Sequence, residues 1–261
     1  MAEKLLINVA HEETRVALVD SGKISNLEID TSRVDNNKGN IYKAIVHRVN
    51  TSLQAAFVDY GAEKQGFLPV AEIHKRYWPA GIREKKPPIQ ELLVQGQELM
   101  VQIVKDEIGN KGASLTTYVS LPGRYLVLMA DSDKTGISRR VDQDERSRLK
   151  RIMSGMDMPE GFGCIIRTAG IGRDEEELRG DLEYLTRLWS NLQEVYRGVR
   201  GSGVIHEERS AALRFIRDYA HAGIDEIVVD NIQAFEEIKN FTTVLVSELK
   251  NKVRLYDDPR P

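Results

Sequence analysis

The sequence has very little cysteine and no long apolar run, and each absence limits what the chain can be. The single cysteine, Cys164, excludes an intrachain disulfide framework and any cysteine-rich zinc site made by this chain alone. A lone free thiol is typical of the reducing cytosol. No stretch approaches the roughly 20 apolar residues that a membrane-spanning helix needs. The N-terminal apolar run is too short for a signal-peptide core, so we expect a soluble cytoplasmic protein.

Neither the histidines nor the overall charge identifies a function. The five histidines are scattered, without the short spacings of metal-binding pairs. The formal net charge is only −3, so the whole chain lacks the basic excess that is common in nucleic-acid-binding proteins. The distribution of charge is more informative, because residues 36–119 hold 11 Lys and Arg against 8 Asp and Glu. A phosphate backbone would therefore prefer this mildly basic middle segment.

Short strand-like runs dominate the first half of the chain. Apolar alternation in residues 4–30, with turns at Ser21-Gly22, predicts a three-stranded antiparallel meander. A polar break follows at residues 35–40. The next short runs are separated by Gly and Pro and predict a small barrel, with strands at 41–49, 53–59, 67–70, 99–105 and 113–119.

Helices become frequent after a boundary near Leu121. Asp142, followed three positions later by Glu145, predicts a capping box at the start of a helix. Leucines and aromatics at three- or four-residue spacing predict the clearest helix of the chain at 174–197. Strands are expected at 124–130 and 161–168, and from residue 207 onward helices and strands alternate in α/β style.

Two aromatics and one lysine of the middle segment are candidates for binding a single strand. Phe57 and Phe67 lie on successive expected strands, and Lys111 lies in a Gly-Asn-Lys-Gly turn before the last strand. Small five-stranded barrels stack bases on strand aromatics, and their Lys and Arg side chains contact phosphates. Two buried core phenylalanines would fit the pattern equally well, so the residues alone leave both interpretations open.

Two long motifs in this segment resemble the RNA-binding barrel of the ribonuclease E/G family. They are FVDYGAEKQGFLPVAEI and GNKGASLTTYVSLPGRYLVL. In that family the barrel is an OB-fold module. The resemblance implies that Phe57, Phe67 and Lys111 contact single-stranded RNA.

A third motif, GCIIRTAGIG at residues 163–172, fits a phosphate site. A guanidinium can hold two phosphate oxygens, a hydroxyl adds a donor, and glycines let backbone N–H groups approach. Alone, Arg167 and Thr168 are equally compatible with an ordinary surface turn. The family resemblance implies a 5′ sensor that binds the 5′-monophosphate of RNA. It assigns Arg167 and Thr168 to the phosphate, and Gly123, Val127, Arg139 and Arg140 to the same pocket.

The resemblance also implies a domain organisation within the α+β class. Residues 1–35 and 215–261 would form a ribonuclease-H-like scaffold, split by an OB-fold barrel at 36–119 and an α/β 5′ sensor at 120–214. A working ribonuclease H needs a carboxylate cluster for two metal ions. The first strand, KLLINVA, carries no acid, and Asp20, Asp30 and Asp230 lie at strand ends. We therefore expect a scaffold without metal.

The family's catalytic part has no counterpart in this sequence. In the family a deoxyribonuclease-I-like domain follows, with an Asp pair for Mg²⁺ and a Cys-x-x-Cys zinc link between subunits. We therefore expect no catalytic residue, metal or cofactor in this chain, and few of the family's homo-oligomer contacts.

Three hypotheses remain open from the sequence. The chain is the N-terminal part of a Mg²⁺-dependent endoribonuclease of RNA processing and decay, inactive by itself, that prefers single-stranded RNA with a 5′-monophosphate. Alternatively, it is a standalone, non-catalytic protein that binds RNA 5′ ends. The third hypothesis is a purely structural or protein-interaction role that uses the helix at 174–197.

Overall fold

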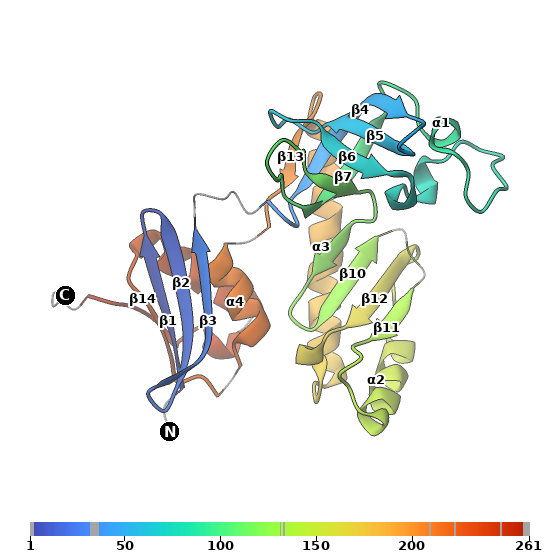
Figure 1. Cartoon of the computed structure of the whole chain (residues 1–261). Coiled ribbons are helices and arrows are strands. Elements are labelled where there is room, and N and C mark those ends of the chain that lie inside the picture. The colour runs from blue at the N-terminus through green and yellow to red at the C-terminus, as the bar shows by residue number, and fades with distance from the viewer. Residues whose placement is uncertain are drawn as a thin grey trace. The chain divides into compact units, whose positions relative to one another are not determined.

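The computed structural model describes residues 3–31, 37–130, 132, 134–208, 210–221, 223–245 and 247–257 (Figure 1). The chain forms two compact units. Unit 1 combines Met1–Asn36 with Arg209–Pro261, and unit 2 comprises Asn37–Glu208. The expected domain boundary at residues 35 and 36 lies outside the described residues. Within the described part, no helix is long and apolar enough to cross a bilayer.

Unit 1 is built on a mixed five-stranded sheet in the order β15-β14-β1-β2-β3. Strands β1 to β3 form the expected antiparallel meander, and β14 lies parallel to β1. Leu5 and Ile7 of β1 are buried with Phe215 of helix α4 in one apolar core. The elements are β1 Glu3–Ala10, β2 Glu13–Asp20, β3 Lys23–Thr31, α4 Ala211–Tyr219, β14 Glu226–Val229, α5 Ile232–Leu245, η4 Ser247–Leu249 and β15 Val253–Leu255.

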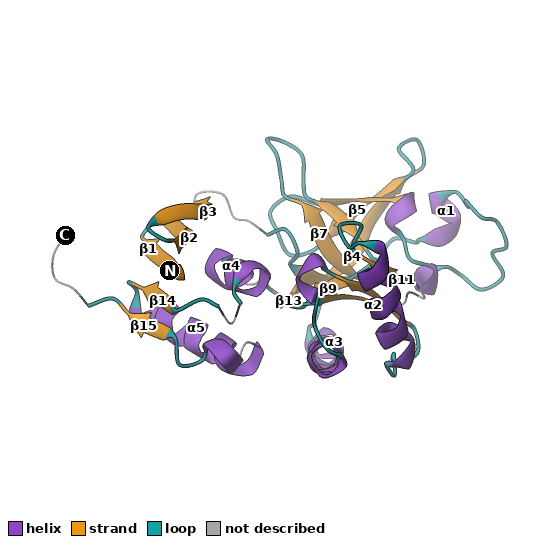
Figure 2. Ribbon diagram, turned by 90° about the horizontal axis from the view of Figure 1, so that it is seen from below, coloured by secondary structure: helices purple, strands orange, loops and turns teal. Residues whose placement is uncertain are grey.

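Unit 2 begins with a closed five-stranded barrel in the order β4-β5-β6-β8-β7, and pairing of β7 with β4 closes it (Figure 2). Strand β13 pairs with β4 outside this ring. Small and branched side chains, among them Ala44, Val58 and Leu68, fill the interior. The elements are β4 Ile41–Asn50, β5 Ala55–Asp59, β6 Gly66–Pro69, η1 Val70–Glu72, η2 Lys75–Tyr77, α1 Ile89–Leu92, β7 Glu98–Lys105, β8 Ser114–Thr116 and β13 Gly203–His206. The expected α+β class with a small five-stranded barrel is confirmed.

The rest of unit 2 is a four-stranded sheet in the order β11-β12-β10-β9. We call it the sensor sheet because it lies in the segment expected from the sequence to form a 5′ sensor. Leu126 and Leu128 of β10 are buried against helices α2 and α3, whereas Val127 and Met129 lie on the opposite, open face. The elements are β9 Ser120–Pro122, β10 Leu126–Ala130, β11 Thr135–Ile137, α2 Gln143–Gly155, β12 Phe162–Ile166, η3 Thr168–Gly170 and α3 Glu175–Gly198.

Helix α3 joins the barrel to the sensor sheet, and Figure 1 shows it running from beside β10 to beside β13. Its N-terminus carries a complete capping box made by Asp174 and Glu177. At its other end, the ammonium group of Lys43 in β4 donates to the carbonyl of Val199 at 3.0 Å. Barrel residue Ile41 belongs to the same apolar cluster as the residues of α3 that cover the sensor sheet. The barrel and the sheet therefore share one core.

Candidate nucleic-acid interface

Phe57 and Phe67 lie next to each other on the outer face of the barrel. They are register partners on β5 and β6, and both are half-exposed. Their ring centroids are 5.9 Å apart, with an interplanar angle of 69°, which is a favourable edge-to-face arrangement. Neither ring belongs to the buried core, so the alternative that both are core residues does not hold.

A β-bulge places an arginine beside this pair. In β4, His47 is an extra residue opposite β5, so Val46 points inward and Arg48 points outward as the partner of Phe57. The guanidinium carbon of Arg48 lies 4.4 Å from the Phe57 ring centroid, well within cation–π range. Among the described residues, Arg48 has no ion-pair partner. The bulge thus adds a cation to the aromatic pair.

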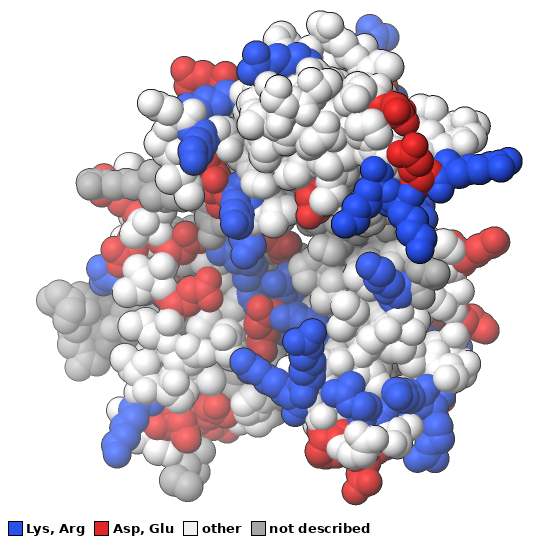
Figure 3. Space-filling model, turned by 45° about the vertical axis from the view of Figure 1, so that its right-hand side comes forward, with Lys and Arg blue, Asp and Glu red and all other residues white. Residues whose placement is uncertain are grey.

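A second bulge, between Ile103 and Lys105 of β7, turns Lys105 outward opposite Ser114 of β8. Because Ser114 is also the register partner of Phe67, one continuous row crosses all five strands. We call it the aromatic band, and it consists of Arg48, Phe57, Phe67, Ser114 and Lys105. It carries a cation at each end. Clusters of Lys and Arg beside uncharged surface are visible on one face of the molecule in Figure 3.

Lys111 lies in an exposed turn that is pinned against the barrel. Backbone hydrogen bonds between Ile108 and Lys111, at 3.0 and 3.1 Å, close the turn. At Gly112 any side chain would collide with the barrel, since a Cβ atom would lie 1.9 Å from the carbonyl oxygen of Gln65. One residue further on, the carbonyl of Ala113 accepts the Phe67 N–H at 2.8 Å. The close approach at Gly112 therefore holds the turn of Lys111 against the barrel, a few residues before Ser114 of the aromatic band.

The second candidate site lies where β10 begins and β12 ends, and a buried carboxylate holds the chain there. Asp181 of α3 accepts three successive backbone N–H groups, those of residues 124, 125 and 126, at 3.1, 2.8 and 2.8 Å. Burial raises the pKa of the Asp181 carboxyl, and these donors and the Arg167 guanidinium oppose that shift. A Cβ atom at Gly123 would lie 2.5 Å from this carboxylate. Glycine is thus required beside it.

Arg167 holds the same turn from the other side. Its guanidinium donates to the carbonyl of Gly123 at 2.6 Å and to that of Arg124 at 3.4 Å. Its backbone N–H donates to the carbonyl of Tyr125 at 2.7 Å. Val127 lies on the open face of β10, paired with Pro122 and Ile165. The structure therefore brings Gly123, Val127 and Arg167 together.

Thr168 contacts the turn that carries the two arginines of GISRR. The hydroxyl groups of Thr168 and Ser138 are 2.9 Å apart. Ser138 is followed by Arg139 and Arg140, whose side chains are exposed. The Arg146 guanidinium donates to the Ser138 carbonyl at 2.8 Å and so holds this turn on α2. We use the name end pocket for the six candidate residues expected from the sequence, which are Gly123, Val127, Arg139, Arg140, Arg167 and Thr168.

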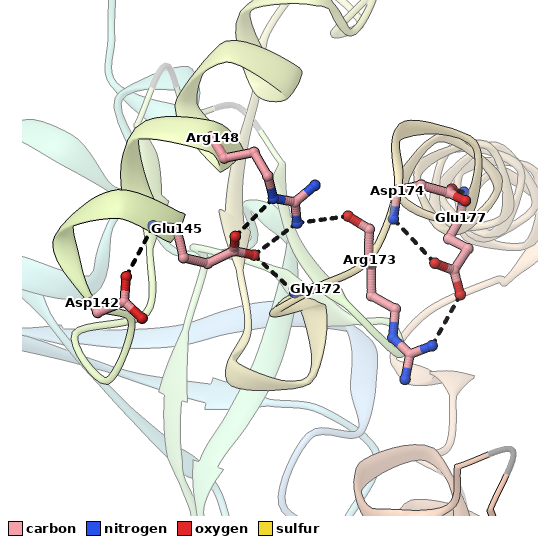
Figure 4. A network of polar contacts seen from close by, with 7 residues as sticks. All are labelled: Asp142, Glu145, Arg148, Gly172, Arg173, Asp174 and Glu177. Carbon is pink, nitrogen blue, oxygen red and sulfur yellow. Dashed lines mark hydrogen bonds and ion pairs between the residues drawn. The ribbon is translucent and has the colours of Figure 1, made fainter.

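A network of polar contacts fixes the loop that follows Thr168 (Figure 4). The Glu145 carboxylate accepts two hydrogen bonds from Arg148, both at 2.7 Å, and one from the N–H of Gly172 at 2.8 Å. Arg148 also donates to the carbonyl of Arg173 at 2.8 Å. These bonds lower the pKa of Glu145 to about 2, with the Arg148 contact as the largest cause. Helix α2 is thereby tied to the chain that carries Arg167.

The expected capping box at α2 is half right. Asp142 caps the helix and accepts the Glu145 N–H at 2.9 Å. The Glu145 side chain does not turn back to Asp142, however, because Arg148 and Gly172 offer it a cation and a backbone donor. The return half of the box is therefore replaced by the tertiary network.

Sequence patterns missed several residues of these sites. Asp181 gave one signal, since it is an acid on the apolar stripe of the 174–197 helix, three residues after Leu178. No sequence pattern indicated Arg48 or Lys105, because each bulge breaks the alternation of inward and outward side chains along its strand. Ser138 is an ordinary serine in a turn, and only its contact with Thr168 distinguishes it.

The described residues show no arrangement suited to metal or thiol chemistry. They contain no group of three or more His, Cys, Asp or Glu side chains that could hold a metal ion. In unit 1, Asp30 pairs with Arg214 at 3.1 Å, and Asp230 accepts the Val9 N–H at 2.8 Å. Burial raises the pKa of the Cys164 thiol to about 12, so it stays protonated at neutral pH.

Comparison with known proteins identifies a domain in unit 2 and the family of the chain. A model of the S1 RNA binding domain matches residues 35–117, so unit 2 contains an RNA-binding domain and RNA is the class of partner that it defines. The Ribonuclease E/G family model matches residues 120–261. The chain belongs to the ribonuclease E/G family.

Relatives in this family match the chain over its full length. Ribonuclease E of Haemophilus influenzae is 44% identical over 262 residues, which are 99% of this chain and 28% of the relative. Ribonuclease E of Escherichia coli is 41% identical, and the match covers 99% of this chain and 25% of the relative. Ribonuclease G of Escherichia coli is 39% identical, and the match covers 100% of this chain and 54% of the relative. The chain thus spans between a quarter and about half the length of these relatives.

Proposed function

We propose that this chain binds single-stranded RNA along the aromatic band and recognises a 5′-monophosphate in the end pocket. It does so as the N-terminal part of a ribonuclease E/G-type endoribonuclease in RNA processing and decay. The observation that carries the proposal is the half-exposed Phe57–Phe67 pair, flanked by cations, on an S1 barrel.

The aromatic band has the chemistry of a sequence-tolerant single-strand site. Every base has a π face, so rings such as Phe57 and Phe67 stack on any base and contribute about 1–3 kcal/mol each. Arg48 at one end and Lys105 at the other supply the charge for the phosphates, and Lys111 adds a third cation near the band. Binding is therefore expected to be strongly salt-dependent.

The end pocket suits a terminal phosphate rather than an internal one. A 5′-monophosphate carries more negative charge than a phosphodiester and offers more acceptor oxygens. Arg167 supplies planar donors beside Gly123, and Thr168 supplies a hydroxyl group at the next position. Because Asp181 holds the turn already formed, little ordering is needed when RNA binds.

For unit 1 we propose a ribonuclease-H-like scaffold without nuclease activity of its own. Its sheet, three antiparallel strands followed by two parallel ones, supports the comparison. The acids expected from the sequence are each held by other partners, Asp30 by Arg214 and Asp230 by the N–H of Val9. No step of metal-assisted hydrolysis is assigned to this chain, and we expect it to bind RNA without cutting it.

The test compares RNAs that differ only at the 5′ end. Fluorescence anisotropy with a 5′-monophosphate RNA should give tighter binding than with its 5′-hydroxyl form. Arg167→Ala should abolish that difference, and Arg167→Lys should restore it only in part, because an ammonium group cannot donate as a fork. Equal affinity of the unaltered protein for both ends would refute the end pocket. Incubation of the same RNA with Mg²⁺ should leave it intact.

The aromatic band is tested separately. Arg48→Ala should weaken binding of both RNAs and reduce its salt dependence. Arg48→Lys keeps the charge but loses the planar stack on Phe57, so it should recover the salt dependence more than the affinity. Lys23→Ala, a charge change on β3 of unit 1, is the control. If Arg48→Ala and Lys23→Ala bind alike, Arg48 is not part of the RNA site.

A further inference from the structure

A cleft of about 1080 Å³ separates the barrel from the open face of the sensor sheet within unit 2. On the barrel side it is lined by His74, Lys75 and Tyr118, and on the sheet side by residues that include Met129, Lys134 and Phe162. None of these residues belongs to the aromatic band or to the end pocket. The volume is slightly larger than the roughly 300–1,000 Å³ of typical ligand pockets.

The walls of the cleft combine a stacking surface with positive charge. The rings of His74 and Tyr118 meet edge to face, with centroids 5.0 Å apart at 84°, and Tyr118 remains 41% exposed. The half-buried Met129 makes the opposite wall apolar, whereas Lys75 and Lys134 are exposed. Among the described residues, no Asp or Glu lines the cleft. An exposed aromatic ring beside two exposed cations suits an unpaired nucleotide.

The position of the cleft links the two sites already described. Met129 and Val127 lie on the same open face of β10, two residues and therefore about 7 Å apart. Val127 belongs to the end pocket. On the other side, Tyr118 follows Ser114 of the aromatic band by four residues. A strand whose first nucleotide occupies the end pocket would therefore enter the cleft next.

We infer that this cleft holds the nucleotides directly after the 5′ end of a bound RNA. One base stacks on Tyr118, and the neighbouring phosphates contact Lys75 and Lys134. The cleft is thus a third contact surface, which makes the end pocket and the aromatic band one continuous path. This inference rests on the proposed function, because it requires that the 5′ end lies in the end pocket.

The first experiment measures affinity for a 5′-monophosphate RNA of about ten nucleotides. Tyr118→Ala should weaken binding roughly tenfold, as expected for loss of one stacked base. Tyr118→Phe keeps the ring and the contact with His74, and it should restore the affinity. Lys134→Ala should weaken binding and reduce its salt dependence, whereas the control Lys23→Ala should not.

The second experiment locates the base on the unaltered protein and so does not depend on the folding of a variant. RNAs with a single 5-iodouridine at successive positions from the 5′ end are irradiated, and the crosslinked peptide is identified. Crosslinks to Tyr118 should appear at the second to fourth nucleotide and should diminish when the 5′-phosphate is removed. Crosslinks to Tyr118 at no position, or equal affinity of Tyr118→Ala, would overturn the inference.

Absence of RNA from the cleft and absence of the 5′ end from the end pocket give different experimental results. If the unaltered protein prefers 5′-monophosphate RNA but Tyr118→Ala binds as tightly, the cleft is refuted and the end pocket stands. If the unaltered protein shows no 5′ preference, the end pocket is refuted and the cleft is refuted with it.

Discussion

Asp181→Asn is the substitution that most directly tests how the end pocket is built. The carboxylate of Asp181 has one oxygen on the N–H of Arg124 and the other on the N–H groups of Tyr125 and Leu126. An amide has only one acceptor oxygen. In either orientation its NH₂ group faces at least one buried backbone N–H, which then has no acceptor.

The expected cost follows from these three bonds. The best orientation of the amide keeps two of them and leaves one buried donor unsatisfied, at about 1–3 kcal/mol. The two remaining bonds also lose the stronger, charge-assisted character that a carboxylate gives them. The amide also escapes the desolvation of a buried charge, which raises the pKa of Asp181, so part of this loss is offset. We therefore expect a net loss of about 1–3 kcal/mol, which for a unit of this size lowers the melting temperature by roughly 2–12 °C.

Calorimetry and hydrogen exchange measure the two parts of this prediction. Melting of Asp181→Asn should shift as stated, and the amides of residues 124–126 should exchange faster than in the unaltered protein. Glu183→Gln is the matched control, because Glu183 is an exposed acid on the same helix, and such a change is normally within about 0.5 kcal/mol. Unchanged protection of the three amides would refute the role assigned to Asp181.

Two further predictions concern the network of α2 and the turn of Lys111. Contact with Arg148 lowers the pKa of Glu145 from 4.5 to about 2. Between these two pH values the unfolded chain binds more protons than the folded one, so the stabilisation by Glu145 is lost as the pH falls from 4.5 to about 2. Urea titrations should therefore show that Glu145→Gln destabilises the protein more at pH 7 than near pH 3. At Gly112 an added Cβ atom would lie 1.9 Å from the Gln65 carbonyl oxygen, so Gly112→Ala should lower the midpoint of urea unfolding and weaken RNA binding. Gly180→Ala, an exposed helical site with no atom within 4 Å, should be stabilising by up to about 1 kcal/mol, and a similar result for Gly112→Ala would contradict the close approach.

Elements whose signal is local were predictable from the sequence. The helix expected at 174–197 is α3, Glu175–Gly198, because its apolar stripe and its capping residues lie within the segment itself. The strands of the meander and of the barrel follow from alternation between breaks. Short elements such as β11 and β13 were missed, since three or four residues carry no usable period and pair with strands far away in the chain.

Side-chain geometry at the sites was less predictable, because it depends on contacts between distant segments. Phe57 and Phe67 could be named from the sequence, but their pairing depends on the register of β5 with β6. Arg48 faces outward only because of the extra residue in β4. The Glu145 carboxylate follows the charge of Arg148 rather than its local capping pattern. In each case tertiary structure decided between conformations that were locally equivalent.

The core shared between the barrel and the sensor sheet makes this RNA-binding domain difficult to transplant. Ile41 and Met100 are buried, yet they pack in the cluster of α3 and the sensor sheet rather than in the barrel interior. A barrel excised at residues 37–119 would expose both side chains to water, together with the surface that α3 covers. Evolution or protein engineering can therefore exchange this barrel for another only if helix α3 changes with it.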